Sequence, residues 1–140
     1  MAETLYLTLD EIIALHDEIL ERMGSSHAPL IHRDTLESAL NRPRTAAWYE
    51  EADLIRQAVL LAIGISQSQA FLDGNKRAAF AATRVFLQMN CLLYRGDSLE
   101  IARWLKLVAE EPSGPGRDAV SDHFEAWLRT QVIPDDSFRP

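Results

Sequence analysis

Apolar residues recur at helical spacing along most of the chain, which predicts a protein built from helices. The spacing is clearest over residues 9–23, 51–67, 78–90, 98–111 and 118–132. The first stretch follows the capping-box spacing of Thr8 and Glu11 and ends at Gly24, a usual helix stop. In the second stretch apolar residues extend almost all the way round, as in a helix that several neighbours bury.

A further, shorter helix is predicted to begin at Asp34 and to end near Arg42 and Pro43, because the residue before a proline is disfavoured in helical geometry. Residues 46–51 then form a connection, with two aromatic residues, Trp48 and Tyr49, folded over an apolar edge. The segment 91–94 is too short to decide between a strand and a helix exit.

Together these elements predict an all-α fold, a compact single-domain bundle of about six helices. The domain is expected to cover residues 1–133, and residues 134–140 are expected to be a frayed C-terminal tail. A chain of 140 residues has room for one core. No repeat and no long internal linker divides it.

The net charge, the cysteine content and the absence of long apolar segments limit what kind of protein this is. The net charge of −7 and the pI near 5.0 argue against direct nucleic-acid binding, which needs a basic surface. Cys91 is the only cysteine, so no intrachain disulfide can form and a cysteine metal site is not supported. The start of the chain lacks the pattern of a signal peptide, and no apolar run reaches membrane-spanning length. A cytoplasmic protein without membrane contact is expected.

The stretch from Phe71 to Arg77 combines a turn, a helix start and two cations. Asp73 and Asn75 are good N-cap residues, and Gly74 permits a close turn into the helix over 78–90. Cations in a first helical turn are disfavoured by about 0.3–1 kcal/mol each. Bound phosphate would offset this cost at Lys76 and Arg77. The simpler alternative is a capped helix with both cations in water.

Residues 69–77, QAFLDGNKR, resemble the signature of the Fic/Doc superfamily, His-x-Phe-x-Asp/Glu-Gly/Ala-Asn-Gly/Lys-Arg. The match holds at Phe71 and at every position from Asp73 to Arg77. The family's leading histidine is replaced by Gln69. A weaker similarity to the Doc branch covers most of residues 5–95, including the segment from His32 to Pro43.

The resemblance implies transfer of part of a nucleoside triphosphate onto a hydroxyl group of a protein. By this resemblance, Asp73 would hold Mg²⁺, Gly74 and Asn75 would form the anion-hole turn, and Arg77 would contact phosphate. These roles suit the residue types, because Mg²⁺ prefers oxygen ligands and a planar guanidinium can contact phosphate through two hydrogen bonds.

Two positions make the chain similar to the Doc, or death-on-curing, branch. Lys76 stands where adenylyl-transferring members usually have glycine, and Phe80 stands where they have a second arginine. The Doc branch transfers phosphate from ATP to a hydroxyl of translation elongation factor Tu and is restrained by an antitoxin. The resemblance therefore predicts the toxin of a toxin–antitoxin pair, with ATP and Mg²⁺ as cofactors and with an antitoxin and elongation factor Tu as partners.

Gln69 departs from the family at the position of the general base. An amide side chain cannot take a proton from the attacking hydroxyl, and loss of a general base costs a factor of about 10²–10⁴ in rate. The other histidines are candidates by type, but none has the motif spacing. They are His16, His27, His32 and His123. For His16, a surface or half-buried position is predicted.

Four interpretations of the Gln69 position stay open. The chain could be an inactive relative that still binds nucleotide, antitoxin or another protein. It could be a slow kinase in which water or a displaced group takes the proton. It could carry a substitution made to silence a toxin, although Ala70 also departs from the proline frequent in relatives, which favours natural drift. Finally, the scaffold alone could be shared, with a pocket for an unrelated ligand.

Overall fold

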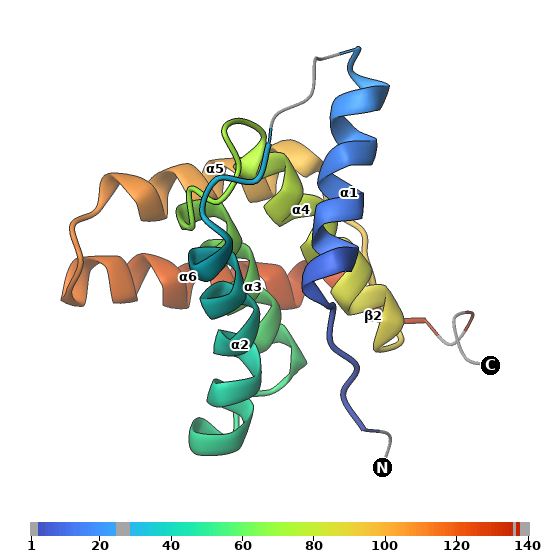
Figure 1. Cartoon of the computed structure of the whole chain (residues 1–140). Coiled ribbons are helices and arrows are strands. Elements are labelled where there is room, and N and C mark those ends of the chain that lie inside the picture. Colours follow the sequence, from blue (N-terminus) through green and yellow to red (C-terminus); the bar gives the residue numbers. More distant parts are fainter. Residues whose placement is uncertain (1–2, 25–28, 136, 138–140) are drawn as a thin grey trace.

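The computed structural model describes residues 3–24, 29–135 and 137, and these residues form six helices and one small antiparallel sheet (Figure 1). The helices are α1 (Leu9–Arg22), α2 (Arg33–Glu50), α3 (Leu54–Gln67), α4 (Asn75–Met89), α5 (Ser98–Glu110) and α6 (Pro115–Gln131). The strands are β1 (Leu92–Tyr94) and β2 (Val132–Pro134). The predicted all-α fold is confirmed.

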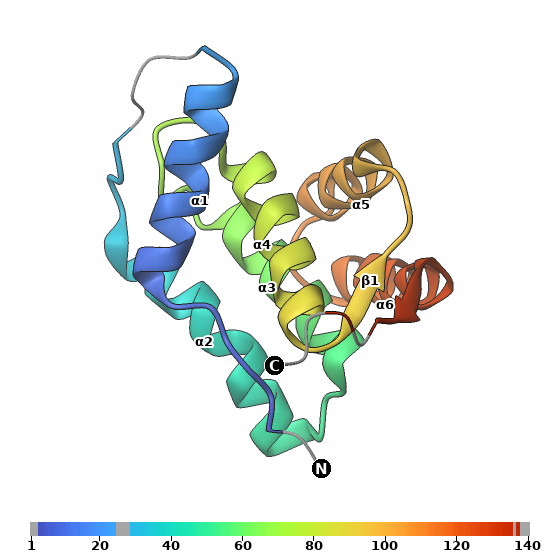
Figure 2. The ribbon, with the colours of Figure 1, turned by 90° about the vertical axis from the view of Figure 1, so that its right-hand side faces the viewer.

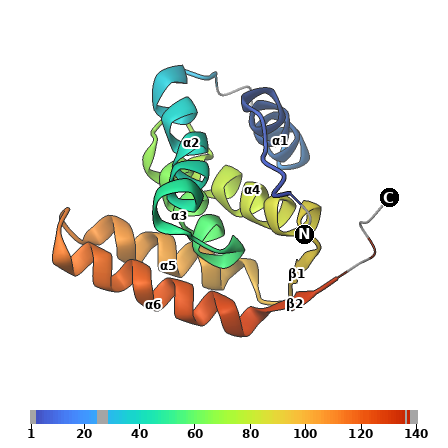
Figure 3. The ribbon, with the colours of Figure 1, turned by 90° about the horizontal axis from the view of Figure 1, so that it is seen from below.

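Helix α3 lies at the centre of the molecule. It contacts α2, α4, α5 and α6, and every residue from Gln57 to Ser66 is buried. Helix α1 packs on α4, on the side away from α5 and α6 (Figure 2), and α5 and α6 run next to each other across the opposite side (Figure 3). Helices α2 and α3 approach closely at Gly64, where an added Cβ would lie 3.1 Å from the Cβ of Ala39 on α2.

Side-chain caps mark the starts of α1, α3 and α5, where the N-cap residues are Thr8, Asp53 and Asp97. Helix α1 has the predicted capping box, in which Thr8 Oγ1 accepts from the Glu11 amide and Glu11 Oε1 accepts from the Thr8 amide. Helix α3 begins three residues later than predicted because Asp53 caps it, with Oδ1 accepting from the Arg56 amide at 2.9 Å. Arg129 of α6 donates to both oxygens of the same carboxylate, which lowers the pKa of Asp53 and links α6 to the start of α3.

The segment 91–94, which the sequence left undecided, contains a strand because a partner for it exists later in the chain. Leu92 pairs with Pro134 and Tyr94 with Val132. The Asp135 amide also donates to the Cys91 carbonyl at 2.9 Å. Beyond Asp135, only Ser137 of the expected tail belongs to the described residues.

The prediction that the second helix ends near Pro43 is wrong. Helix α2 continues to Glu50, and Pro43 belongs to a buried stripe at helical spacing, formed by Leu36, Ala39, Pro43 and Ala46. Packing of this stripe on α3 offsets the hydrogen bond that proline cannot donate. The helix ends at Glu50, and its C-cap residue Glu51 adopts a left-handed conformation with φ of 54°.

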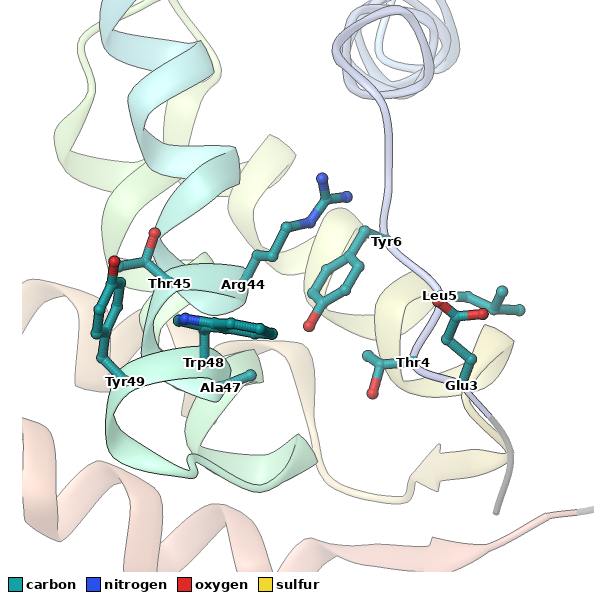
Figure 4. Close-up of a pocket in the computed structure, with 9 residues that line it drawn as sticks. All are labelled: Glu3, Thr4, Leu5, Tyr6, Arg44, Thr45, Ala47, Trp48 and Tyr49. Carbon is teal, nitrogen blue, oxygen red and sulfur yellow. The ribbon is translucent and has the colours of Figure 1, made fainter.

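Trp48 and Tyr49 lie on this extended helix, not in a connection, and the expected packing over an apolar edge is wrong. Their exposed fractions are 80% and 78%. They line a surface pocket of about 880 Å³ together with the extended N-terminal segment (Figure 4). Arg44, one turn before Trp48 on the same helix, also lines this pocket, and its guanidinium lies 4.6 Å from the centre of the Tyr6 ring.

No helix in the described ranges combines the length and the hydropathy that crossing a membrane requires.

Replacing Trp48 by alanine is expected to change the free energy of unfolding by less than about 0.5 kcal/mol, because the side chain makes little buried contact. The matched change Phe124→Ala removes a fully buried ring and is expected to cost about 3–5 kcal/mol. Urea unfolding followed by circular dichroism measures both values. A loss at Trp48 comparable to that at Phe124 would contradict the position of α2.

Candidate functional site

A cleft of about 330 Å³ lies at the connection between α3 and α4. It is lined by Ser66, Gln69 and every residue from Leu72 to Arg77. The structure therefore brings together in one cleft all the residues that the sequence selected as site residues, namely Gln69, Asp73, Gly74, Asn75, Lys76 and Arg77.

Helix α4 begins at Asn75, so Lys76 and Arg77 lie in its first turn as predicted, and its N-cap is Gly74 in a left-handed conformation with φ of 85°. The first backbone bond of the helix runs from the Ala78 amide to the Gly74 carbonyl at 2.9 Å. No side chain of the described residues caps this helix. The amides of Asn75, Lys76 and Arg77 therefore remain available to an anion in the cleft.

The prediction that Asp73 and Asn75 cap the helix is wrong, because both side chains bind the loop instead. Asp73 Oδ1 accepts from the Gly74 amide at 2.8 Å. Asn75 binds both backbone groups of Phe71, accepting from its amide at 3.1 Å and donating to its carbonyl at 2.9 Å. This pair of bonds closes the loop from Phe71 to Asn75 into a fixed turn.

A second backbone segment holds the loop from outside. The amides of Ile31 and His32 donate to the Ala70 carbonyl at 2.6 and 3.0 Å, and the Leu72 amide donates to the Pro29 carbonyl at 3.1 Å. This pairing, which resembles a short stretch of antiparallel sheet, fixes the loop between residues 70 and 72. It leaves Ile31 and Leu72 with exposed apolar side chains.

His16 supports the loop from beneath. Its side chain is fully buried, its ring stacks on Phe71 with centroids 3.6 Å apart, and its Nε2 lies 2.7 Å from the Asp73 carbonyl oxygen. The prediction of a surface or half-buried histidine is wrong. Ile12, His16 and Leu20 are spaced four residues apart and are the buried positions of α1, and this spacing is the sequence signal that could have placed His16 inside.

The two cations of the cleft are exposed, and so is the Asp73 carboxylate. Within the described ranges, neither Lys76 nor Arg77 has a carboxylate within salt-bridge distance. The guanidinium of Arg77 contacts the Met23 sulfur at the end of α1. Two cations at the positive end of a helix dipole make this side of the cleft attractive to anions.

Asp73 is the only carboxylate among the residues that line the cleft. No group of three or more metal-binding side chains occurs in the described part of the chain. Mg²⁺ commonly binds proteins through one or two carboxylates and completes its shell with water and substrate phosphates. The donor set therefore fits Mg²⁺ that arrives with a nucleotide, and does not fit a metal ion held by the protein alone.

The family model described as Fic/DOC family matches residues 6–87, more than half of the chain, and this range contains the whole cleft. The chain belongs to the Fic/Doc family. No curated protein matches it in sequence.

In this Fic/Doc chain, Gln69 lines the cleft and follows the C-cap of α3 with φ of 52°. Glycine is the usual residue at such a left-handed position after a helix. Here the position carries an amide side chain, exposed at the edge of the cleft.

None of the histidines that the structure describes lines the cleft beside Gln69. His16 is buried with its Nε2 bound to the loop, and neither His32 nor His123 lines the cleft. His27 lies outside the described residues. The cleft of this Fic/Doc chain therefore has two cations and an uncapped helix start but no imidazole from the described residues.

The left-handed backbone at Gln69 is expected to make the stability depend on the residue type there. A left-handed conformation costs non-glycine residues about 1–2 kcal/mol and is least tolerated by β-branched ones. Gln69→Gly should therefore have a higher free energy of unfolding than Gln69→Val, by roughly 1–2 kcal/mol, as measured by urea unfolding. Equal stabilities of the two variants would contradict this backbone conformation.

Proposed function

We propose that the chain is a Doc-like toxin that transfers the γ-phosphoryl group of ATP to a hydroxyl of translation elongation factor Tu, at a rate that Gln69 lowers. One observation carries the proposal. A single cleft combines an exposed carboxylate, two cations and an uncapped helix start, which are the groups needed to bind the phosphates of a Mg²⁺-nucleotide.

The positions that distinguish the branches support the Doc assignment. Lys76 in the first turn of α4 gives the cleft a second cation where glycine would leave space. Phe80, at the place of a second arginine, is half-buried, packs edge-on against Tyr94 and does not line the cleft. The cationic groups that line the cleft are thus one lysine and one arginine, which suits binding of the transferred terminal phosphate.

In the proposed reaction, the hydroxyl oxygen of the target forms a bond to the γ-phosphorus and the bond from that phosphorus to the bridging oxygen of ADP breaks. Asp73 would hold the Mg²⁺ that neutralises the phosphate oxygens, while Lys76, Arg77 and the first amides of α4 bind them. The proton of the hydroxyl passes to water, because Gln69 cannot accept it. Loss of the base slows the step by about 10²–10⁴-fold, while phosphate binding is kept.

The exposed apolar side chains next to the cleft suit a protein substrate. Ile31 and Leu72 lie on the paired backbone segments that border the loop, and they are 49% and 67% exposed. An extended segment of a target that covers them would bring its hydroxyl to the cleft beside Gln69.

The alternative is a catalytically inactive Doc-like module that binds nucleotide or an antitoxin. A groove of about 190 Å³ between α1 and α4 favours it, because its lining combines the apolar side chains of Leu15, Ile19, Ala81 and Val85 with polar and charged residues of both helices. Such a groove fits the apolar face of a partner helix. An antitoxin bound there would also fit the first proposal.

The test measures transfer of label from γ-labelled ATP to elongation factor Tu with Mg²⁺ present, for the chain as it stands and for Gln69→His. Restoring the imidazole is expected to raise the transfer rate by about 10²-fold or more. Arg77→Ala in the Gln69→His background is the control and should abolish the gain, because the phosphate contact is lost. Absence of transfer in both the chain and Gln69→His would contradict the kinase and favour the binding module.

A further inference from the structure

We infer that His16 is a positioning residue, which orients the Asp73 carboxylate and the first amides of α4 toward the cleft by holding the peptide between Asp73 and Gly74. The inference concerns the loop itself, and its consequence for ligand binding rests on the proposed nucleotide site. His16 touches no ligand, since its side chain is fully buried.

The direction of the Asp73–Gly74 peptide carries the argument. No cis peptide occurs in the described part of the chain, and in a trans peptide the carbonyl and the amide point in opposite directions. The Asp73 carbonyl points inward to His16 Nε2, at 2.7 Å. The Gly74 amide therefore points away from the interior, and Asp73 Oδ1 accepts from it at 2.8 Å. His16 thus fixes the side on which the carboxylate lies.

The hydrogen bond also defines the tautomer of His16. A carbonyl oxygen only accepts hydrogen bonds, so Nε2 must carry a proton and donate it to the Asp73 carbonyl. Nδ1 has no hydrogen-bond partner among the described residues, and the Asp17 carboxylate lies 3.8 Å away. A buried histidine in which only one ring nitrogen has a hydrogen-bond partner is less stabilising at this position than an apolar residue would be. Space filling alone would be met by leucine, as at Leu20 on the same face.

The absence of a side chain at Gly74 leaves room for the His16 ring. An added Cβ would lie 3.1 Å from His16 Nε2 and 3.6 Å from Leu20 Cδ2, and the left-handed backbone at Gly74 disfavours any side chain. The histidine ring therefore occupies the space next to the glycine. Stacking on Phe71 holds the ring in its plane, while Asn75 holds Phe71 from the other end of the loop.

The test compares two substitutions of His16 in the whole chain. In His16→Gln, the amide nitrogen of the new side chain can reach the place of Nε2 and donate to the Asp73 carbonyl. In His16→Leu, the volume is kept and the donor is lost. The readouts are the exchange rate of the Gly74 amide by NMR and the affinity for MgATP by calorimetry, with the exchange of the buried Leu61 amide as a measure of global stability.

His16→Leu is expected to speed exchange at Gly74 about tenfold relative to Leu61 and to weaken MgATP binding about tenfold, since a buried carbonyl loses its donor. His16→Gln should stay within about threefold of the original chain in both readouts. Unchanged exchange and affinity in His16→Leu would overturn the inference, and so would equal losses in both variants, which would indicate packing alone.

Two further comparisons keep the test decisive. If His16→Leu does not fold, His16→Asn replaces it, because its shorter side chain cannot reach Asp73, and the same losses are expected. If the original chain binds no MgATP, the proposed nucleotide site fails, while the exchange at Gly74 still decides whether His16 holds the loop.

Discussion

The start of α4 has first-turn amides that no side chain of the described residues caps, and this constraint explains the arrangement of the loop before it. Asp73 and Asn75 are the residues that would ordinarily cap such a helix. Asp73 instead bonds to the Gly74 amide and Asn75 to the backbone of Phe71. The polar side chains stabilise the loop and leave the helix start open to a ligand.

The rest of the fold supplies rigid support for this open helix start. The pairing of residues 29–32 with 70–72 holds one side of the loop, His16 of α1 holds its underside, and the buried α3 fixes where the loop begins. Two uncompensated cations at the positive end of a helix are unfavourable without an anion. An anion bound beside Lys76 and Arg77 would offset this cost.

Much of the fold follows from local sequence patterns, because caps and helical periodicity act over a few residues. Thr8 and Glu11 marked the start of α1 correctly, and the cleft residues were selected as one contiguous stretch. Features that depend on distant partners were missed. Pro43 remains helical because it packs in a buried stripe. Residues Leu92 to Tyr94 form a strand only because they pair with β2. His16 is buried by a loop more than fifty residues later in the chain.

The chain belongs to the Fic/Doc family, and under the proposed function its phosphate binding and its catalysis depend on different groups. Under that proposal, phosphate binding would use backbone amides and cations that line the cleft, whereas proton removal would need a side chain that Gln69 cannot replace. The most direct measurement is an NMR titration of the chain with MgATP. The largest shifts are predicted at the amides of residues 74–77; shifts centred elsewhere, or none, would contradict a phosphate site at the start of α4.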